Sequence, residues 1–163
     1  MSRASSLVLL IVLLTSHAWA ADRPGTEALT LLEGELLERP AFEAPFYELL
    51  AEALSPGGWE DLDKRWEKDQ GRNRRFLVLR GMLAERQGRF DNARKHYAAA
   101  KADEWGAYHH ARLVAFLGET EAAVRELRQI VDRTEERWLF REAALGLGEL
   151  AHLRQGPAEA EKV

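Results

Sequence analysis

The chain has 163 residues, of which 46% are hydrophobic and 31% charged, with a formal net charge of −4 and no cysteine. This length suits one domain, and the composition is typical of a folded helical protein rather than a disordered chain. The mild acidity argues against nucleic acid as a partner. The absence of Cys excludes disulfides and a cysteine-linked lipid anchor.

The first twenty residues have the pattern of a secretory signal peptide. Arg3 gives a positively charged start, Leu7–Leu14 is an unbroken apolar run, and an A-x-A cleavage site ends at Ala20. The run is too short to cross a bilayer, which needs about 20 residues. We therefore predict a signal peptide at residues 1–20 and secretion across the inner membrane into the periplasm, with no membrane span after cleavage. An uncleaved anchor is the alternative.

Residues 21–55 are predicted to form N-terminal helices. Leucines recur at helical spacing along Thr26–Glu38, and apolar side chains do the same along Phe42–Leu54. We expect Pro45 to interrupt the second of these helices. A Ser-Pro-Gly-Gly run at 55–58 is the clearest chain break and separates this region from the next.

Residues 56–163 are predicted to form a series of helical hairpins. Apolar residues at three- and four-residue steps indicate a helix on each side of a turn at Gly88, which has the character of a left-handed helix stop. The expected helices are Trp59–Glu67, the two arms of the segment Phe76–Ala102, then Glu104–Leu117, Thr120–Val131 and Trp138–Arg154.

The segment around Gly88 has the small residues that a close helix crossing needs. Two antiparallel helices approach closely only where a small side chain leaves room, as Gly81 and Ala93 do. This hairpin resembles the tetratricopeptide repeat (TPR). The family pattern falls on Gly81, Gly88, Phe90, Ala93, Tyr97 and Ala100. The family's Trp and Leu near the start of the first helix fall on Leu77 and Arg80, so that end departs from the pattern.

The hairpin pattern recurs along the chain. Gly118 follows Gly88 by 30 residues, and Gly156 follows Gly118 by 38, near the roughly 34 residues of a TPR repeat. An imperfect copy precedes them at Trp59–Trp66. The resemblance implies an all-α fold in which tandem antiparallel helical hairpins form a short TPR-like α-solenoid. An unrelated helical bundle is the alternative.

The resemblance also implies a binding surface. In the TPR family the first helices of successive hairpins line a concave groove that binds a protein or peptide partner. Carried over to this chain, the groove face includes Arg75, Met82, Arg86, Trp105, Tyr108 and Arg112. Trp, Tyr and Arg are typical of binding hot spots. The alternative is that the aromatic residues are core packing between hairpins. We expect the protein to bind its partner within an envelope or secretion assembly.

No catalytic or metal-binding arrangement stands out in the sequence. His109 and His110 are adjacent, so on a helix their side chains point about 100° apart and cannot both face one metal ion. No pair of histidines has the i, i+4 spacing that would place both side chains on one face of a helix. We interpret these histidines as surface or groove-lining residues, and we expect no catalytic residues, no metal site, no cofactor and no enzymatic activity.

The last predicted helix, Trp138–Arg154, raises a second functional hypothesis. Few residues follow the turn at Gly156, so this helix is expected to lack a cover on one side. An exposed apolar edge is expected at Trp138, Leu139, Leu145 and Leu150. The alternative function is therefore a structural subunit that forms a homo-oligomer through its C-terminal helix.

Overall fold

The structure, a computed structural model, describes residues 26–40, 43–53 and 58–155. In these ranges it has eight helices and no strand, which confirms the predicted all-α class. The helices are α2 (Thr26–Glu38), α3 (Glu43–Glu52), α4 (Gly58–Asp69), α5 (Arg75–Arg86), α6 (Phe90–Ala100), α7 (Glu104–Phe116), α8 (Thr120–Arg133) and α9 (Arg137–Gln155). The predicted signal peptide at 1–20 and the predicted turn at Gly156 lie outside the described residues.

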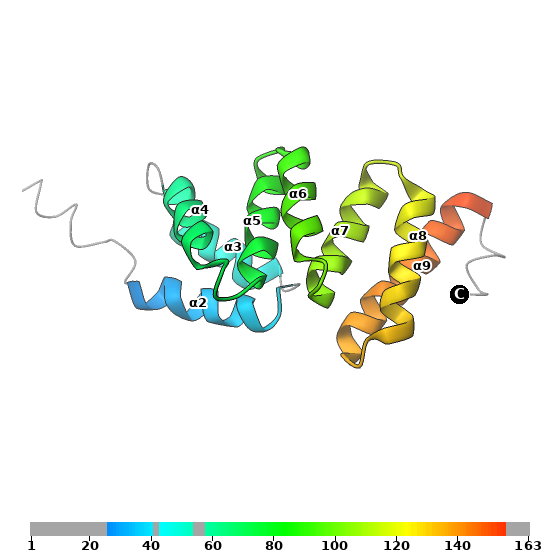
Figure 1. Cartoon of the computed structure of the whole chain (residues 1–163), viewed down its shortest axis with the longest axis horizontal. Coiled ribbons are helices and arrows are strands. Elements are labelled where there is room, and N and C mark those ends of the chain that lie inside the picture. Colours follow the sequence, from blue (N-terminus) through cyan, green and yellow to red (C-terminus); the bar gives the residue numbers. More distant parts are fainter. Residues whose placement is uncertain (1–25, 41–42, 54–57, 156–163) are drawn as a thin grey trace, which may run out of the picture.

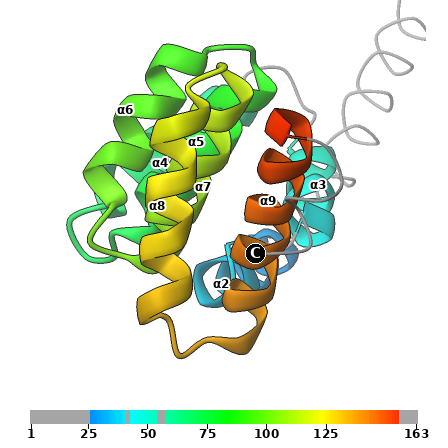
Figure 2. The same ribbon diagram turned by 90° about the vertical axis from the view of Figure 1, so that its right-hand side faces the viewer.

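The helices form a repeat-like row. From α4 to α9 they follow one another along the molecule, α3 lies between and behind α4 and α5, and α2 runs across one end of these first helices (Figure 1). From α4 onward each helix packs against the next, and α7 also packs against both α5 and α9. Seen end-on, α6 and α8 lie on one side and α3 and α9 on the other (Figure 2). No helix in the described ranges is long and apolar enough to cross a membrane.

The α5–α6 and α7–α8 turns are built in the same way. Gly88 has a φ of +70°, and the Arg89 N–H donates to the carbonyl oxygen of Ala84 at 2.8 Å. The equivalent bond in the second turn is 3.0 Å long, and Gly118 there has a φ of +86°. This is the Schellman helix ending, which places a residue in the left-handed region that glycine adopts without strain. The predicted turn at Gly88 is confirmed.

Two glycines let neighbouring helices approach closely. A Cβ atom on Gly81 would lie 2.2 Å from Cε1 of Tyr97, so only glycine fits where α5 crosses α6. Ala93, the other predicted small position, is fully buried. The α6–α7 crossing is equally close, because a Cβ on Gly106 would lie 2.4 Å from the carbonyl oxygen of Ala100. Gly106 was not among the small residues predicted to allow a close crossing.

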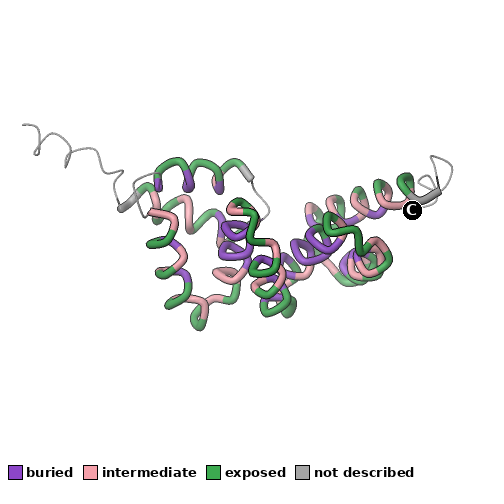
Figure 3. The backbone as a smooth tube through the Cα atoms, turned by 90° about the horizontal axis from the view of Figure 1, so that it is seen from above, coloured by how far each residue is buried: buried purple, intermediate pink, exposed green. Residues whose placement is uncertain are grey.

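The buried side chains form two cores along the row. The first joins α2 to α6 and takes Leu113 from α7. The second joins α7, α8 and α9. Trp66 and Tyr97 are the largest fully buried side chains, and both belong to the first core. Figure 3 shows the buried residues where helices face their neighbours and the exposed residues on the outer sides. The α7 helix therefore contributes to both cores.

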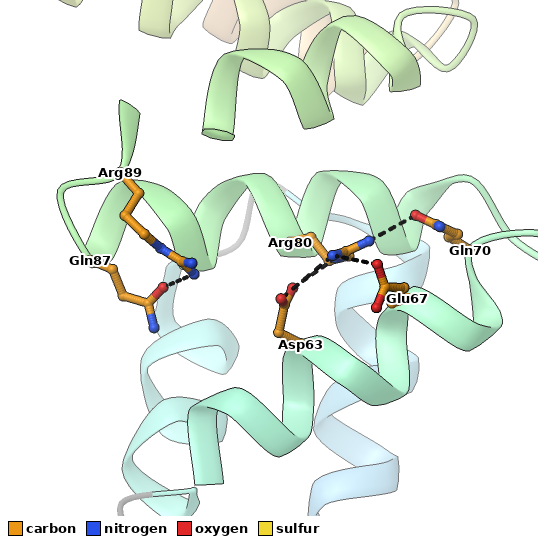
Figure 4. Close-up of polar contacts among 6 residues, drawn as sticks. All are labelled: Asp63, Glu67, Gln70, Arg80, Gln87 and Arg89. Carbon is orange, nitrogen blue, oxygen red and sulfur yellow. Dashed lines mark hydrogen bonds and ion pairs between the residues drawn. The ribbon is translucent and has the colours of Figure 1, made fainter. Parts of the chain in front are cut away.

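Arg80 of α5 is buried among polar side chains of the preceding segment. Its Nε donates to Asp63 Oδ1 at 2.7 Å, Nη2 lies 3.3 Å from Glu67 Oε1, and Nη1 donates to Gln70 Oε1 at 3.1 Å (Figure 4). The Arg80 side chain is only 9% exposed, so the guanidinium depends on these partners for the solvation it has lost. The ion pairs hold α4 against α5 at a position where the TPR pattern has an apolar residue.

The structure corrects the prediction for α3. This helix begins at Glu43, so Pro45 lies in its first turn and does not interrupt it. The first turn tolerates proline because its backbone N–H groups have no partner within the helix.

The predicted apolar edge of α9 is confirmed at Leu145, which is 56% exposed, but needs correction at Leu139 and Trp138. Leu139 is fully buried, and the ring of Trp138 lies 5.7 Å from that of Trp105. The large apolar side chains that α9 exposes are Phe140, Leu145 and Leu153. Because Leu139 and Trp138 point toward α7 and α8, the exposed edge is rotated around the helix relative to the prediction.

Candidate functional site: two adjacent cavities along α5, α7 and α9

A cavity of about 270 Å³ opens between α3, α5 and α7, and we call it the α5–α7 cavity. Its walls are largely aromatic and aliphatic, with charged groups among them: Phe46, Tyr47, Met82, Glu85, Arg86, Phe90, His109, Arg112, Leu113 and Phe116. The rings of Phe90 and Phe116 lie 5.3 Å apart, and Phe116 is 71% exposed. A large apolar side chain held this open to solvent is more typical of a binding surface than of a core.

A second cavity, of about 470 Å³, lies mainly between α7 and α9, and we call it the α7–α9 cavity. It is lined by Tyr108, Arg112, Ala115, Leu127, Trp138, Glu142, Leu145, Gly146, Glu149 and Leu150. Arg112 lines both cavities, so the two are neighbours on the same side of the helix row. We refer to the two cavities together as the inner groove.

Two arginines of the inner groove lie against tyrosine rings. The Cζ atom of Arg86 is 4.1 Å from the ring centroid of Tyr47, and that of Arg112 is 5.8 Å from the ring centroid of Tyr108. Such cation–π contacts restrict the guanidinium groups while leaving their N–H groups able to donate hydrogen bonds. Both arginines are exposed, whereas Tyr108 is buried.

Four of the six predicted groove residues lie on the cavity walls. Met82 and Arg86 line the α5–α7 cavity, Tyr108 lines the α7–α9 cavity, and Arg112 lines both. Tyr47 and several other residues also line the cavities, although they were not predicted to do so. The sequence gives little indication that Tyr47 lines a cavity. Helical periodicity in α3 predicts which face of this helix is apolar, but not which later helix packs against that face. Partner binding by these residues stays a prediction.

Arg75 has a different position from the predicted one. Its Nη1 donates to the carbonyl oxygens of Leu37 and Glu38 at 2.6 and 2.7 Å, and its Nε donates to Asp103 Oδ2 at 3.0 Å. Leu37 and Glu38 end α2, where carbonyls lack partners within the helix and attract positive charge. Arg75 therefore ties α2 to the starts of α5 and α7, and it lines neither cavity.

Trp105 is a core residue. Only 5% of it is exposed, and it packs against Trp138 within the second core. Its backbone N–H is held by Asp103, whose side chain caps α7 at 3.0 Å. The alternative interpretation, core packing between hairpins, describes Trp105 better than a groove position does.

The two adjacent histidines are buried, so the expectation of surface residues was wrong, whereas the expectation of a groove-lining residue holds for His109. His109 Nε2 donates to the carbonyl oxygen of Pro40 at 3.2 Å, and its ring stacks on Tyr97 with centroids 5.3 Å apart. His110 Nδ1 lies 2.8 Å from Glu126 Oε2, and Lys101 contacts the other oxygen of Glu126 at 2.7 Å. Despite its burial, Glu126 has a lowered pKa, because Lys101 and His110 hydrogen-bond its carboxylate. Only His109 borders the inner groove.

Burial lowers the pKa of His109 to about 3, and the Arg112 guanidinium adds to the shift. His109 is thus uncharged at neutral pH. Between its folded pKa and the ordinary value of 6.5, the unfolded chain binds a proton that the folded chain does not. The free energy of unfolding must therefore decrease as the pH falls through this window.

We expect this loss to reach about 2 kcal/mol between pH ~6.5 and pH ~5, since one pH unit of a single titration corresponds to about 1.4 kcal/mol. His109→Gln, whose amide can still donate to Pro40, should be less dependent on pH over this range. Urea unfolding of both proteins at about pH 7 and about pH 5 measures the difference. Equal losses in the two proteins would contradict the assignment to His109.

The described residues contain no group of three or more His, Cys, Asp or Glu side chains arranged to hold a metal ion. No family model, curated protein or solved structure matches the chain.

Proposed function

We propose that the protein is an exported, TPR-like interaction module that binds a peptide or helical segment of a protein partner in the inner groove. The observation that carries the proposal is the pair of adjacent cavities joined at Arg112, with aromatic and arginine side chains on their walls. Concave surfaces with a few placed polar groups and aromatic walls are typical of recognition sites.

Three features support the TPR-like part of the proposal. The two hairpin turns share one hydrogen-bond pattern, which is expected of repeated units. The close α5–α6 crossing at Gly81 uses the small position of the family pattern. The inner groove lies along α5, α7 and α9, which are the first helices of the proposed hairpins. Export is supported by the first twenty residues of the sequence, with their charged start, apolar run and A-x-A site.

The chemistry of the inner groove supports binding rather than catalysis. His109 is its only described histidine, and the lowered pKa of about 3 makes its ring a weak base at neutral pH. The ring nitrogen that donates to Pro40 is also engaged. We therefore propose that the protein acts by equilibrium binding.

A second candidate function is self-association through α9. The observation that favours it is the exposure of Phe140, Leu145 and Leu153, which are 46%, 56% and 78% exposed. In this case the partner is another copy of the chain and the α5–α7 cavity has no role.

A cross-linking pull-down from the native cell envelope tests the proposal. Arg112→Ala/Phe116→Ala removes one charge and one exposed ring from the groove, and should reduce capture of partner proteins by roughly tenfold or more. Leu31→Ala/Arg128→Ala is the control, because these residues are also exposed but lie outside the groove. Circular dichroism should show that both variants keep their helices.

The outcomes separate the two candidates. Partners lost only from the groove variant support the inner groove, whereas equal capture by both variants contradicts it. If the captured protein is chiefly a second copy of the chain, and Phe140→Asp, at an exposed residue of α9 outside both cavities, abolishes that capture, self-association through α9 is the function.

A further inference from the structure

The α5–α7 cavity can receive one large apolar side chain. Its volume of about 270 Å³ exceeds the roughly 150 Å³ of a cavity known to hold benzene in another protein. Met82 and Leu113 are buried in its wall, while Phe116 and Tyr47 are 71% and 40% exposed. An aromatic or large aliphatic side chain placed here would cover apolar surface that water now contacts.

Arg86 gives this cavity an electrostatic preference. Its guanidinium lies over the Tyr47 ring, and within the described ranges it forms no hydrogen bond or ion pair. By contrast, Arg75, Arg80 and Arg94 all pair with carboxylates. A positioned guanidinium without a carboxylate partner favours an incoming anion, which it binds by charge-assisted hydrogen bonds.

The charges divide the inner groove into two unlike halves. The α5–α7 cavity has two guanidiniums, Arg86 and Arg112, against the single carboxylate of Glu85, and its histidine is neutral. Burial raises the pKa of the Tyr97 hydroxyl, and the nearby Glu85 carboxylate adds to the increase. The α7–α9 cavity is less positive, because Glu149 and Glu142 face Arg112 there, and within the described residues only Glu142 has a further cation, Arg141, as its ion-pair partner. Negative charge on a partner is therefore favoured more at the α5–α7 end than at the α7–α9 end.

We propose that the α5–α7 cavity binds an aromatic or large aliphatic side chain of a peptide partner, and that Arg86 pairs with an Asp or Glu next to that residue. The inference rests on the proposed function, because it assumes a peptide in the inner groove. It adds the chemistry of the partner and the end of the groove that its acidic part occupies.

Selection from a displayed library of random dodecapeptides on the purified protein tests the inference. Three proteins are compared: the wild type, Arg86→Glu, and the control Arg89→Glu. Arg89 is a matched control because it is exposed, lies three residues from Arg86, and bonds to the Gln87 side chain outside both cavities (Figure 4). Circular dichroism before selection should show equal helix content.

On the wild type and on Arg89→Glu, the enriched peptides should carry a Phe, Trp, Tyr, Leu or Met next to an Asp or Glu. On Arg86→Glu the acidic preference should disappear. The best synthetic peptide should bind Arg86→Glu on the order of tenfold more weakly than the control. Its affinity for the wild type should also fall as salt is added.

The remaining outcomes distinguish failure of this inference from failure of the proposed peptide-binding function. Enriched peptides without an acidic preference, or with the same preference on Arg86→Glu, overturn the inference and leave peptide binding intact. If the wild type enriches no peptide above protein-free beads, the peptide-binding function is overturned together with the inference.

Discussion

Replacing Gly81 with Ala is expected to destabilise the protein by about 3 kcal/mol, because overpacking a filled core forces side chains or backbone to move. The added Cβ would lie 2.2 Å from the Tyr97 ring, and two further ring atoms are within 2.7 Å. Tyr97 is fully buried beneath α5, so its ring has no free space to enter. The crossing of α5 and α6 must therefore widen, which also disturbs the wall of the α5–α7 cavity.

Urea unfolding measures this effect, and Gly148→Ala is its matched control. Gly148 also lies inside a helix, but a Cβ there would meet no atom within 4 Å. Alanine at Gly148 should stabilise the protein by up to about 1 kcal/mol through its higher helix propensity. Adding Tyr97→Leu to Gly81→Ala should recover part of the loss by removing the ring. If Gly81→Ala and Gly148→Ala change the free energy of unfolding equally, the close approach of α5 and α6 at Gly81 is contradicted.

Arg80→Ala is the second substitution with a large expected effect. It removes the guanidinium from a buried network and leaves Asp63, whose side chain is 28% exposed, without its partner. Breaking a fully buried ion pair costs about 3–5 kcal/mol, and the partial exposure of Asp63 reduces our expectation to about 2–3 kcal/mol. Chemical denaturation gives the value directly.

The matched control is Arg94→Ala. Arg94 also pairs with a carboxylate on another segment, but its side chain and that of Glu119 are 43% and 42% exposed. We expect a loss below about 1 kcal/mol there. An NMR titration of His96 supplies an independent signal. The pKa of His96 is lowered by burial and then by Arg80, so it should rise in Arg80→Ala and stay unchanged in Arg94→Ala. Equal stability losses in the two variants would contradict the buried network.

The helices and turns could be predicted from the sequence because their causes are local. Apolar spacing located every described helix to within a few residues, and Gly88 and Gly118 marked the turns that the structure contains. The close crossing at Gly81 could also be predicted, because a small residue among large ones indicates a neighbour at short range.

The composition of the site was harder to predict because it depends on contacts between distant segments. Arg75 was expected in the groove, but its partners include Leu37 and Glu38 at the end of α2, which periodicity does not reveal. His109 has a backbone partner 69 residues away, at Pro40, and this distant contact explains its burial. Tyr47 enters the site for the opposite reason, since α3 brings it beneath Arg86. Residue type alone does not separate an arginine engaged within the fold from one that faces solvent.

The row-like packing has a consequence for how the chain reaches its native state. From α4 onward each helix packs against the next, so most native contacts join segments close in sequence, and such low contact order is associated with folding in microseconds to milliseconds. A chain that crosses a membrane unfolded must fold again on the far side. If the first twenty residues direct export, successive hairpins can form in the order in which they emerge. The contact between His109 and Pro40 could then close only after α7 has emerged, 69 residues after Pro40, when the α2–α3 region can dock onto α7.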